Sequence, residues 1–177
     1  MNAAAQAAGG GWTEKDVRSF SLSPFARIGE DWMLISAGGE RDWNAMTASW
    51  GGLGVLWNAN VAFAFVRPTR HTFGYLERAD SFSLSFFDPA YRKALSFFGA
   101  HSGRDCDKAA GAGLTPIVFD DGCLSFAEAR EVFYCRKLYA QDIDPERFID
   151  LGLNVHYPDK DYHRLYIGAI ERFRARP

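Results

Sequence analysis

Residues 81–87, with the sequence SFSLSFF, constrain the fold of this chain more than any other segment. Serine alternates with phenylalanine or leucine, so an extended backbone places apolar side chains on one face and hydroxyls on the other. This period of two indicates a half-buried β-strand. Asp88 and Pro89 follow directly, and a carboxylate N-cap with proline at the first helical position favours a helix start. The segment therefore predicts a strand that leads into a helix, which ends at Gly99.

Other segments extend this pattern of strands and short helices. Five more strands are predicted, at residues 32–37, 44–50, 60–66, 127–139 and 165–173, the last interrupted by Gly168. Two of the remaining short helices are predicted at residues 13–20 and 102–111, with Thr13 and Ser102 as N-caps, and a third at residues 72–79. Many strands with short inserted helices are typical of a mainly β fold, here a β-barrel with helical decorations.

Polar residues and glycines between these segments have simple structural interpretations. Glu128, Arg130 and Glu131 are interpreted as a solvated strand face. The glycine pair at residues 51–52 is predicted to form a turn. Residues 120–122, Asp-Asp-Gly, are predicted to form a hairpin turn and not a calcium loop, because the other ligand positions are missing.

The bulk composition is that of one globular domain. Of the 177 residues, 47% are apolar and 15% aromatic, which excludes a disordered chain. The aromatic side chains either fill a β core or form a surface for a planar ligand or a second subunit. A net charge of -2 disfavours a nucleic-acid partner, and no segment approaches the roughly 20 apolar residues of a membrane span.

The cysteines and the first eleven residues indicate in which compartment the protein is located. The three cysteines, Cys106, Cys123 and Cys135, have neither CxxC nor metal-ligand spacing, so we predict free thiols, no metal and a cytoplasmic protein. Residues 1–11 are rich in alanine and glycine and lack a basic region before an apolar core. They are predicted to be a disordered leader and not a signal peptide, which leaves residues 12–177 as the domain.

The sequence GAHSGRD at residues 99–105 is the most informative candidate for a binding site. Gly103 permits close backbone approach, Ser102 offers a hydroxyl, and Arg104 offers a planar fork that matches phosphate oxygens. A predicted helix start and Lys108 add positive charge. The segment is either a cradle for one phosphate or an ordinary helix–turn–helix corner with a capping serine and a solvated arginine.

Two further segments point towards the same kind of ligand. The sequence RPTRHT at residues 67–72 combines two arginines, two hydroxyls and a helix start, although strand-to-helix loops often carry such residues. The sequence NAMTASW at residues 44–50 leaves backbone amides beside Met46 and Trp50, as a flavin ring requires. The alternative is a strand of small residues packed under a helix.

These segments together resemble a known family. The strings NAMTASWGGLG, FVRPTRHT, SFSLSFF and ALSFFGAHSGRDCDK occur in this order and are similar to the flavin reductase-like FMN-binding split-barrel family, especially its flavoredoxin-like branch. The resemblance covers residues 32–173 and implies a six-stranded split β-barrel of Greek-key type. It also implies a homodimer that binds FMN near the subunit interface.

The resemblance assigns roles to individual positions. The isoalloxazine and ribityl positions are Met46, Thr47, Ala48, Ser49 and Trp50. The residues expected near the ribityl phosphate are Arg67, Thr69, Arg70 and Thr72, with Ser85 and Phe86 beside the ribityl chain. The other residues expected to contact the phosphate are Gly99, Ser102, Gly103, Arg104 and Lys108.

One departure from the family bears on the electron donor. Many reductases of the family carry Gly-Asp-His before a glycine-containing strand, whereas this chain has Asp161-Tyr162-His163 and keeps Gly168. His163 is therefore either a substrate contact or a hydrogen-bonded residue entering the last strand. The resemblance implies an NAD(P)H-dependent flavin oxidoreductase that passes electrons to a small molecule or a protein. The alternatives are a flavoredoxin-like carrier without a nicotinamide site, or a module that stores or senses FMN.

Overall fold

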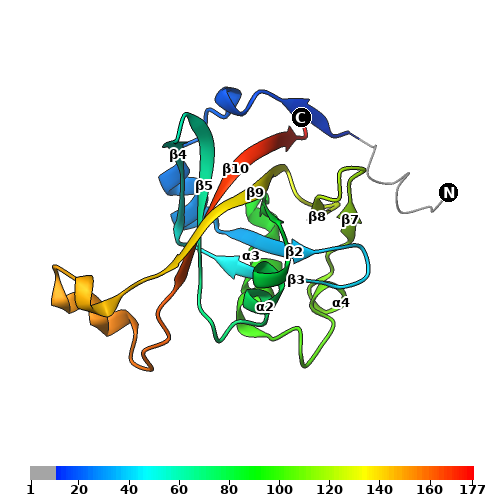
Figure 1. Cartoon of the computed structure of the whole chain (residues 1–177). Coiled ribbons are helices and arrows are strands. Elements are labelled where there is room, and N and C mark those ends of the chain that lie inside the picture. The colour runs from blue at the N-terminus through cyan, green and yellow to red at the C-terminus, as the bar shows by residue number, and fades with distance from the viewer. Residues whose placement is uncertain (1–10) are drawn as a thin grey trace.

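An antiparallel sheet of eight strands dominates the computed structural model, which describes residues 11–177. Along the sheet the order is β3 (Trp43–Ala48), β2 (Met33–Gly38), β6 (Ser81–Phe86), β9 (Glu131–Asp142), β10 (Arg164–Ala175), β5 (Ala59–Val66) and β4 (Gly51–Leu56). The short strand β1 (Thr13–Lys15) also pairs with β10. Figure 1 shows β9 and β10 running side by side through the middle of the molecule.

All six strands predicted from the sequence are present, and the sheet has two more, so the expected count of six is wrong. The first additional strand is β4, which contains the glycine pair predicted as a turn. These glycines are extended and pair with β5, and the actual turn is at Trp57 and Asn58, both with positive φ. A Cβ at Gly51 would lie 2.9 Å from both Met33 Cε and the Phe63 carbonyl oxygen, so close packing and not a turn requires this glycine.

The second additional strand is β1, which replaces the helix predicted from Thr13. Thr13 pairs with Ala175 of β10, and only a single 3-10 turn (η1, Val17–Ser19) follows. The N-cap of this turn is Asp16, whose carboxylate accepts a hydrogen bond from the Arg18 amide. Pairing with a strand 160 positions away outweighs the weak local preference for a helix. The predicted leader at residues 1–11 lies, except for Gly11, outside the described residues.

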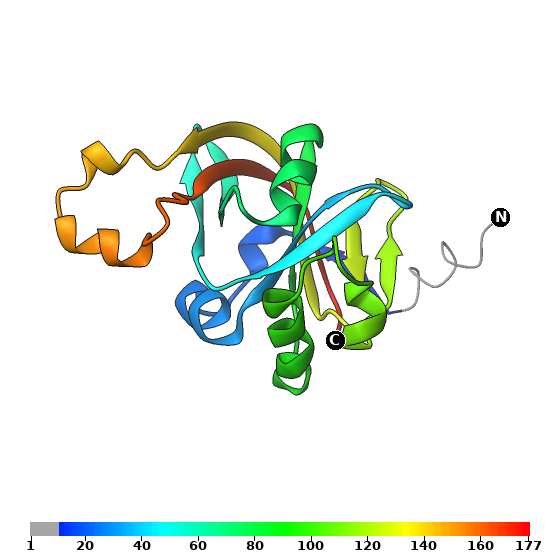
Figure 2. The same cartoon turned by 90° about the horizontal axis from the view of Figure 1, so that it is seen from below.

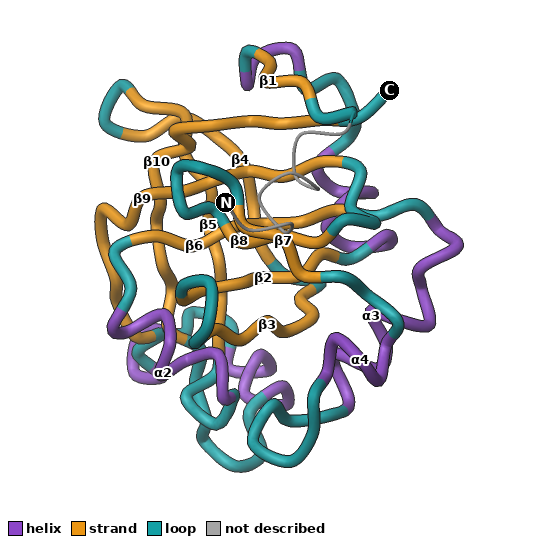
Figure 3. The backbone as a smooth tube through the Cα atoms, turned by 90° about the vertical axis from the view of Figure 1, so that its right-hand side faces the viewer, coloured by secondary structure: helices purple, strands orange, loops and turns teal. Residues whose placement is uncertain are grey.

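Short helices gather on the β3 side of the sheet, as Figure 3 shows. Helix α2 (His71–Arg78) contacts β2 and β3, and α3 (Arg92–Ala100), which follows a 3-10 turn (η3, Pro89–Tyr91), contacts β3 and α4 (Lys108–Ala112). The helix predicted from Ser102 thus begins six residues later, with Asp107 as its N-cap. The small hairpin of β7 (Pro116–Val118) and β8 (Leu124–Phe126) turns at Gly122, as predicted. No helix within residues 11–177 has the length and apolar character that crossing a membrane requires.

A buried ion pair corrects the interpretation of Glu131 as a solvated residue. Glu131 is 8% exposed, and its carboxylate accepts a hydrogen bond of 2.7 Å from the Arg27 guanidinium. Arg27 lies in a π-helical turn (η2, Ala26–Asp31) and also donates to Asp31 at 2.9 Å. Alternation within the strand could not reveal this partner, because it lies 104 positions earlier in the chain.

Between β9 and β10 the chain leaves the body of the protein. Residues 143–163 contain two 3-10 segments, η4 (Pro145–Arg147) and η5 (Leu151–His156), and project away from the sheet in two perpendicular views (Figures 1 and 2). We call residues 143–163 the excursion. Its exposed apolar side chains are Ile149, Leu151, Leu153 and Val155. The sheet register shifts at Gly168 of β10, where a Cβ would lie 2.7 Å from the Phe82 ring, and this confirms the predicted interruption.

Candidate functional site

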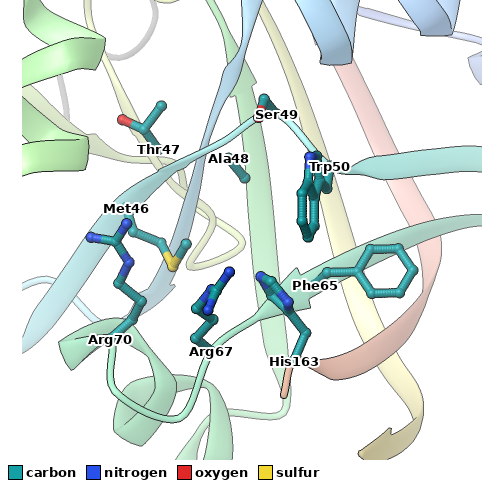
Figure 4. Close-up of a pocket in the computed structure, with 9 residues that line it drawn as sticks. All are labelled: Met46, Thr47, Ala48, Ser49, Trp50, Phe65, Arg67, Arg70 and His163. Atoms are coloured by element: carbon teal, nitrogen blue, oxygen red, sulfur yellow. The ribbon is translucent and has the colours of Figure 1, made fainter. Parts of the chain in front are cut away.

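Two neighbouring cavities lie where β3 and β5 end and α2 begins. The first, the Trp50 cavity, has a volume of about 180 Å³ and is lined by Met46, Thr47, Ala48, Ser49, Trp50, Phe65, Arg67, Arg70 and His163 (Figure 4). The second, the Lys108 cavity, has a volume of about 140 Å³ and is lined by Asn44, Met46, Thr69, Arg70, His71, Thr72, Ala100, His101, Ser102, Arg104 and Lys108. Met46 and Arg70 line both, so one ligand can extend through the two cavities.

The Lys108 cavity is positively charged and contains no carboxylate. Lys108 is 5% exposed, and its ammonium donates a hydrogen bond of 2.6 Å to the Ala45 carbonyl oxygen. Burial, followed by the nearby positive charge of Arg70, lowers the pKa of Lys108 to about 8. Within residues 11–177, neither Lys108 nor Arg70 nor Arg104 forms an ion pair. A buried cation without an anionic partner is unusual, so this cavity is a candidate site for an anion.

The loop at residues 101–107 closes the Lys108 cavity by a different geometry from the predicted one. It forms a turn, with the Asp105 amide donating to the Ser102 carbonyl oxygen at 3.1 Å, and not a helix start. This loop therefore contributes the Arg104 side chain and no helix N-terminus, whereas the start of α2 also lies at the cavity. Arg70 holds the end of α3, just before this loop, by donating to the Gly99 carbonyl oxygen at 2.8 Å. A Cβ at Gly103 would lie 2.3 Å from Asn44 Oδ1, so this close approach requires glycine.

The Trp50 cavity has an aromatic wall formed by residues from distant parts of the chain. The Trp50 ring is 43% exposed, and its centroid lies 5.1 Å from that of His163 and 5.4 Å from that of His156. The Thr47 hydroxyl donates to the Leu95 carbonyl oxygen, which fixes β3 against α3. Figure 4 shows the Trp50 ring and the His163 imidazole directed towards each other, with Arg67 and Arg70 on one side.

Arg67 has a different role from the predicted phosphate contact. It lines the Trp50 cavity and not the Lys108 cavity, and it forms an ion pair with Asp161. It also donates to the His156 carbonyl oxygen at 2.8 Å, and its guanidinium lies 5.1 Å from the Tyr157 ring centroid. Arg67 therefore attaches the excursion to the cavity, and its charge is already neutralised.

His163 is a neutral residue at the floor of the Trp50 cavity. It is 8% exposed, and its Nδ1 is hydrogen-bonded to the Tyr157 hydroxyl at 2.9 Å. Burial, followed by the positive charge of Arg67, lowers the pKa of His163 to about 4. His163 is thus a hydrogen-bonded residue at the entry to β10, and it also lines the cavity, where a substrate contact stays a prediction. The sequence pattern did not indicate Tyr157, which lies six positions away in an irregular segment.

The neutral state of His163 predicts how stability depends on pH. An unfolded histidine binds a proton near pH 6.5, whereas folded His163 resists protonation down to about pH 4. Between these values the unfolded state binds more protons, so the free energy of unfolding must fall as the pH falls. We expect His163→Gln to reduce this loss between pH 6.5 and 4 in urea titrations, and the exposed control His101→Gln to leave it unchanged. Equal pH slopes for wild type and His163→Gln would contradict the assignment.

Most of the predicted positions line the two cavities, but Ser85, Phe86, Gly99 and Gly103 do not. Ser85 is fully buried and its hydroxyl lies 2.9 Å from that of Ser125, while Phe86 is fully buried in the core. Neither residue lines the cavities, so their predicted place beside the ligand has no support in the structure. The residues that line a cavity without having been predicted are Asn44, Phe65, His71, Ala100 and His101. Each lies within or next to a predicted segment, so proximity in sequence was the available signal.

The residues that form this site lie within a range of the chain that matches a protein-family model. Residues 25–177 match the model described as a flavin reductase like domain. The chain belongs to the flavin reductase-like family. The matched range includes both cavities and all strands except β1. No curated protein matches the chain in sequence.

The family match confirms the predicted mainly β fold of split-barrel type, here with an open antiparallel sheet, and solved structures share the fold of this flavin reductase-like protein. An FMN-binding domain of a flavin reductases-like enzyme from Shewanella baltica has a TM-score of 0.68 at 14% identity and covers 93% of this chain and 77% of its own. Flavoredoxin of Desulfovibrio vulgaris has a TM-score of 0.63 at 19% identity, with coverages of 92% and 76%. An NADH:FAD oxidoreductase of Streptomyces globisporus, in complex with NAD and FAD fragments, has a TM-score of 0.61 at 16% identity, with coverages of 83% and 74%.

Proposed function

We propose that this protein binds FMN non-covalently, with the phosphate in the Lys108 cavity and the ring system in the Trp50 cavity. The observation that carries the proposal is the buried ammonium of Lys108, which has no anionic partner within the described residues. A phosphate would neutralise this charge and those of Arg70 and Arg104, and the Ser102 and Thr72 hydroxyls line the same cavity. The positive charges of Arg104 and Lys108, after burial, also lower the pKa of His71, as expected beside an anion site.

The residues of the Trp50 cavity fit a flat heteroaromatic ring. Met46 and Trp50 offer apolar surface, and residues 47–50 offer backbone groups at the end of β3, where pairing with β2 stops at Ala48. When bound, FMN would supply the chemistry, namely acceptance and donation of a hydride or of single electrons. The protein would bind and orient the cofactor, and His163 would remain a neutral imidazole at its edge throughout the physiological pH range.

We further propose that the protein is an NAD(P)H-dependent flavin oxidoreductase. Family membership supports this function. A second candidate is an electron carrier of the flavoredoxin type, which the replacement of Gly-Asp by Asp161-Tyr162 before His163 favours. Asp161 forms an ion pair with Arg67, so a change at this position alters the charge next to the cavity. The three free thiols among the described residues support a reducing compartment such as the cytoplasm.

Visible absorption of the purified protein tests both proposals in one sample. We expect bands near about 370 and 450 nm after incubation with FMN and removal of the excess, as for other bound flavins. Anaerobic bleaching by NADH or NADPH would support the oxidoreductase, whereas bleaching only by a reduced protein partner would support the carrier. Retention of FAD in place of FMN would change the cofactor assignment. A protein that retains no flavin would refute the central proposal.

We also propose that the protein is a homodimer and that the excursion forms part of its interface. Ile149 is fully exposed, and Leu151 and Val155 are 71% and 77% exposed, which is unfavourable for a projecting segment in water. We expect a dimer in sedimentation velocity experiments, and dissociation when Ile149→Asp places a charge in the interface. The control Ser96→Asp lies at an exposed position of α3 and should leave the dimer intact. A monomeric wild type would contradict the proposal.

A further inference from the structure

A third cavity adjoins the proposed flavin site. It has a volume of about 620 Å³, within the range of small-molecule pockets, and we call it the Phe25 groove. Its lining residues are Pro24, Phe25, Ile28, Gly29, Ser49, Trp50, Gly51, Gly52, Leu53 and Phe65. Ser49, Trp50 and Phe65 also line the Trp50 cavity, so these residues form the wall that the two cavities share. In Figure 4 the Phe65 ring lies on the far side of Trp50 from Arg67 and Arg70.

The lining of the Phe25 groove is uncharged. None of its ten described residues is acidic or basic, whereas the Trp50 cavity has two arginines and the Lys108 cavity has three basic side chains besides its histidines. Phe25 is 87% exposed at the rim, and a ligand would bury this ring together with that of Trp50. Burial of apolar surface therefore favours the binding of an apolar ligand in this groove. A charged ligand would lose its hydration without gaining an oppositely charged partner.

The floor of the groove is formed by the backbone of β4. Gly51 and Gly52 have no side chains that could fill it, and β4 is the last strand in the order of the sheet. An edge strand has unpaired amide and carbonyl groups along its outer side, and these can bind a carbonyl or hydroxyl of a ligand. The groove thus combines a flat apolar enclosure with a small number of backbone hydrogen-bonding groups.

We propose that the Phe25 groove binds a neutral, flat, apolar compound with a single carbonyl or hydroxyl group, as the substrate of the flavin. Such a compound would accept a hydride from the reduced flavin and a proton from water, so that it gains two electrons and the flavin loses two. This inference rests on the proposed function and adds the substrate class to it. The diphosphate of a dinucleotide is excluded from this groove because no lining residue can neutralise its charge. Contact through the shared wall of Trp50 and Phe65 places such a compound beside the cavity proposed for the flavin ring.

A pair of probes that differ in charge tests the proposal on the FMN-loaded protein. Acetonaphthone is neutral, and naphthoate has the same two rings with a carboxylate in place of the acetyl group. Titration calorimetry gives both affinities, and the visible flavin bands report whether the probe binds next to the ring. We expect acetonaphthone to bind at least about tenfold more tightly than naphthoate, a difference that electrostatic desolvation readily produces.

Substitution of Leu53 gives a result that loss of folding cannot imitate. Leu53→Lys is expected to weaken the binding of acetonaphthone and to strengthen the binding of naphthoate. The ratio of the two affinities should therefore fall by about tenfold or more. Val55→Lys is the matched control, because Val55 lies on the same strand outside the groove and is 73% exposed. Phe25→Ala, at an exposed position, is expected to weaken the binding of acetonaphthone without changing the visible bands of FMN.

Three results would overturn the inference. The first is retention of FMN with no binding of acetonaphthone. The second is equal affinity for the two probes, and the third is an affinity ratio that Leu53→Lys leaves unchanged. If acetonaphthone fails to bind and Leu53→Lys dissociates a dimer, the groove holds a second copy of the chain and not a substrate. Absence of the FMN bands, measured first, would instead refute the proposed function.

Discussion

Replacement of Lys108 by methionine is expected to weaken FMN binding by roughly 10- to 150-fold, the range that a hydrogen bond to a charged group provides. The ammonium is 5% exposed and has no carboxylate partner within the described residues, so a bound phosphate would experience little screening by water. Methionine keeps the apolar stem and removes the ammonium, whose nitrogen lies 5.0 Å from the centroid of the Phe98 ring. Fluorescence titration of FMN measures the change directly.

The same residue predicts a pH dependence of FMN binding. Because the pKa of Lys108 in the free protein is lowered to about 8, its ammonium is largely charged at pH 7 and largely neutral at pH 9. Phosphate binds the charged form, so affinity should fall as the pH rises above about 8, approaching tenfold per pH unit for one proton taken up. Lys108→Met should abolish this slope.

A control substitution distinguishes a specific contact from a general effect of charge. Lys93 is exposed on α3 and lines neither cavity, so Lys93→Met removes the same charge without touching the site. We expect Lys93→Met to bind FMN as the wild type does and to keep the pH slope. If both variants lose affinity equally, Lys108 acts only through the overall charge of the protein, and the phosphate belongs elsewhere.

Replacement of Glu131 by alanine is expected to lower the free energy of unfolding by about 3–5 kcal/mol, because it leaves the buried Arg27 guanidinium without its main partner. The Arg27 and Glu131 side chains are 9% and 11% exposed, so water cannot replace the lost interaction. This pair joins η2, which lines the Phe25 groove, to the start of β9. Urea denaturation at 25 °C measures the loss.

Two comparisons give this stability prediction its controls. Glu171 forms an exposed ion pair with Arg136, so Glu171→Ala should cost no more than about 1 kcal/mol. The double variant Arg27→Leu with Glu131→Leu removes both charges and should recover much of the stability lost in Glu131→Ala. A Glu131→Ala variant as stable as Glu171→Ala would mean that Arg27 finds sufficient compensation in Asp31 and the Phe87 carbonyl oxygen.

The strands could be predicted wherever neighbouring side chains alternate. Residues 81–87 are the clearest case, since the structure has a strand at Ser81–Phe86. The prediction that this strand is half-buried is wrong, because every residue of it but the first is buried. Strand β4 was missed because its three glycines resemble a turn locally, whereas pairing with β5 keeps them extended. Strand β1 was missed because its stability comes from β10, at the other end of the chain. Local patterns therefore predicted the interior of the sheet better than its edges.

Some features of the site could likewise be predicted from local sequence, whereas others depend on residues far away in the chain. The short segments 44–50, 67–72 and 99–108 supply most of the residues that line the two cavities, since each segment contains several of them in sequence. Composition within these segments was enough to indicate an anion beside a flat ring. It could not reveal that Ser85 points into the core, because both faces of β6 are covered in the folded protein.

The chemistry available at this site can be predicted from local sequence: basic side chains, hydroxyls, glycines and an aromatic residue in three short segments. Which of the cations are free depends on how the chain folds. Arg67 is neutralised by Asp161, 94 positions later, whereas Lys108 is buried with a carbonyl oxygen as its hydrogen-bond acceptor. The physical reason is that charge pairing depends on distance in space, and the sheet brings together residues that no local pattern connects.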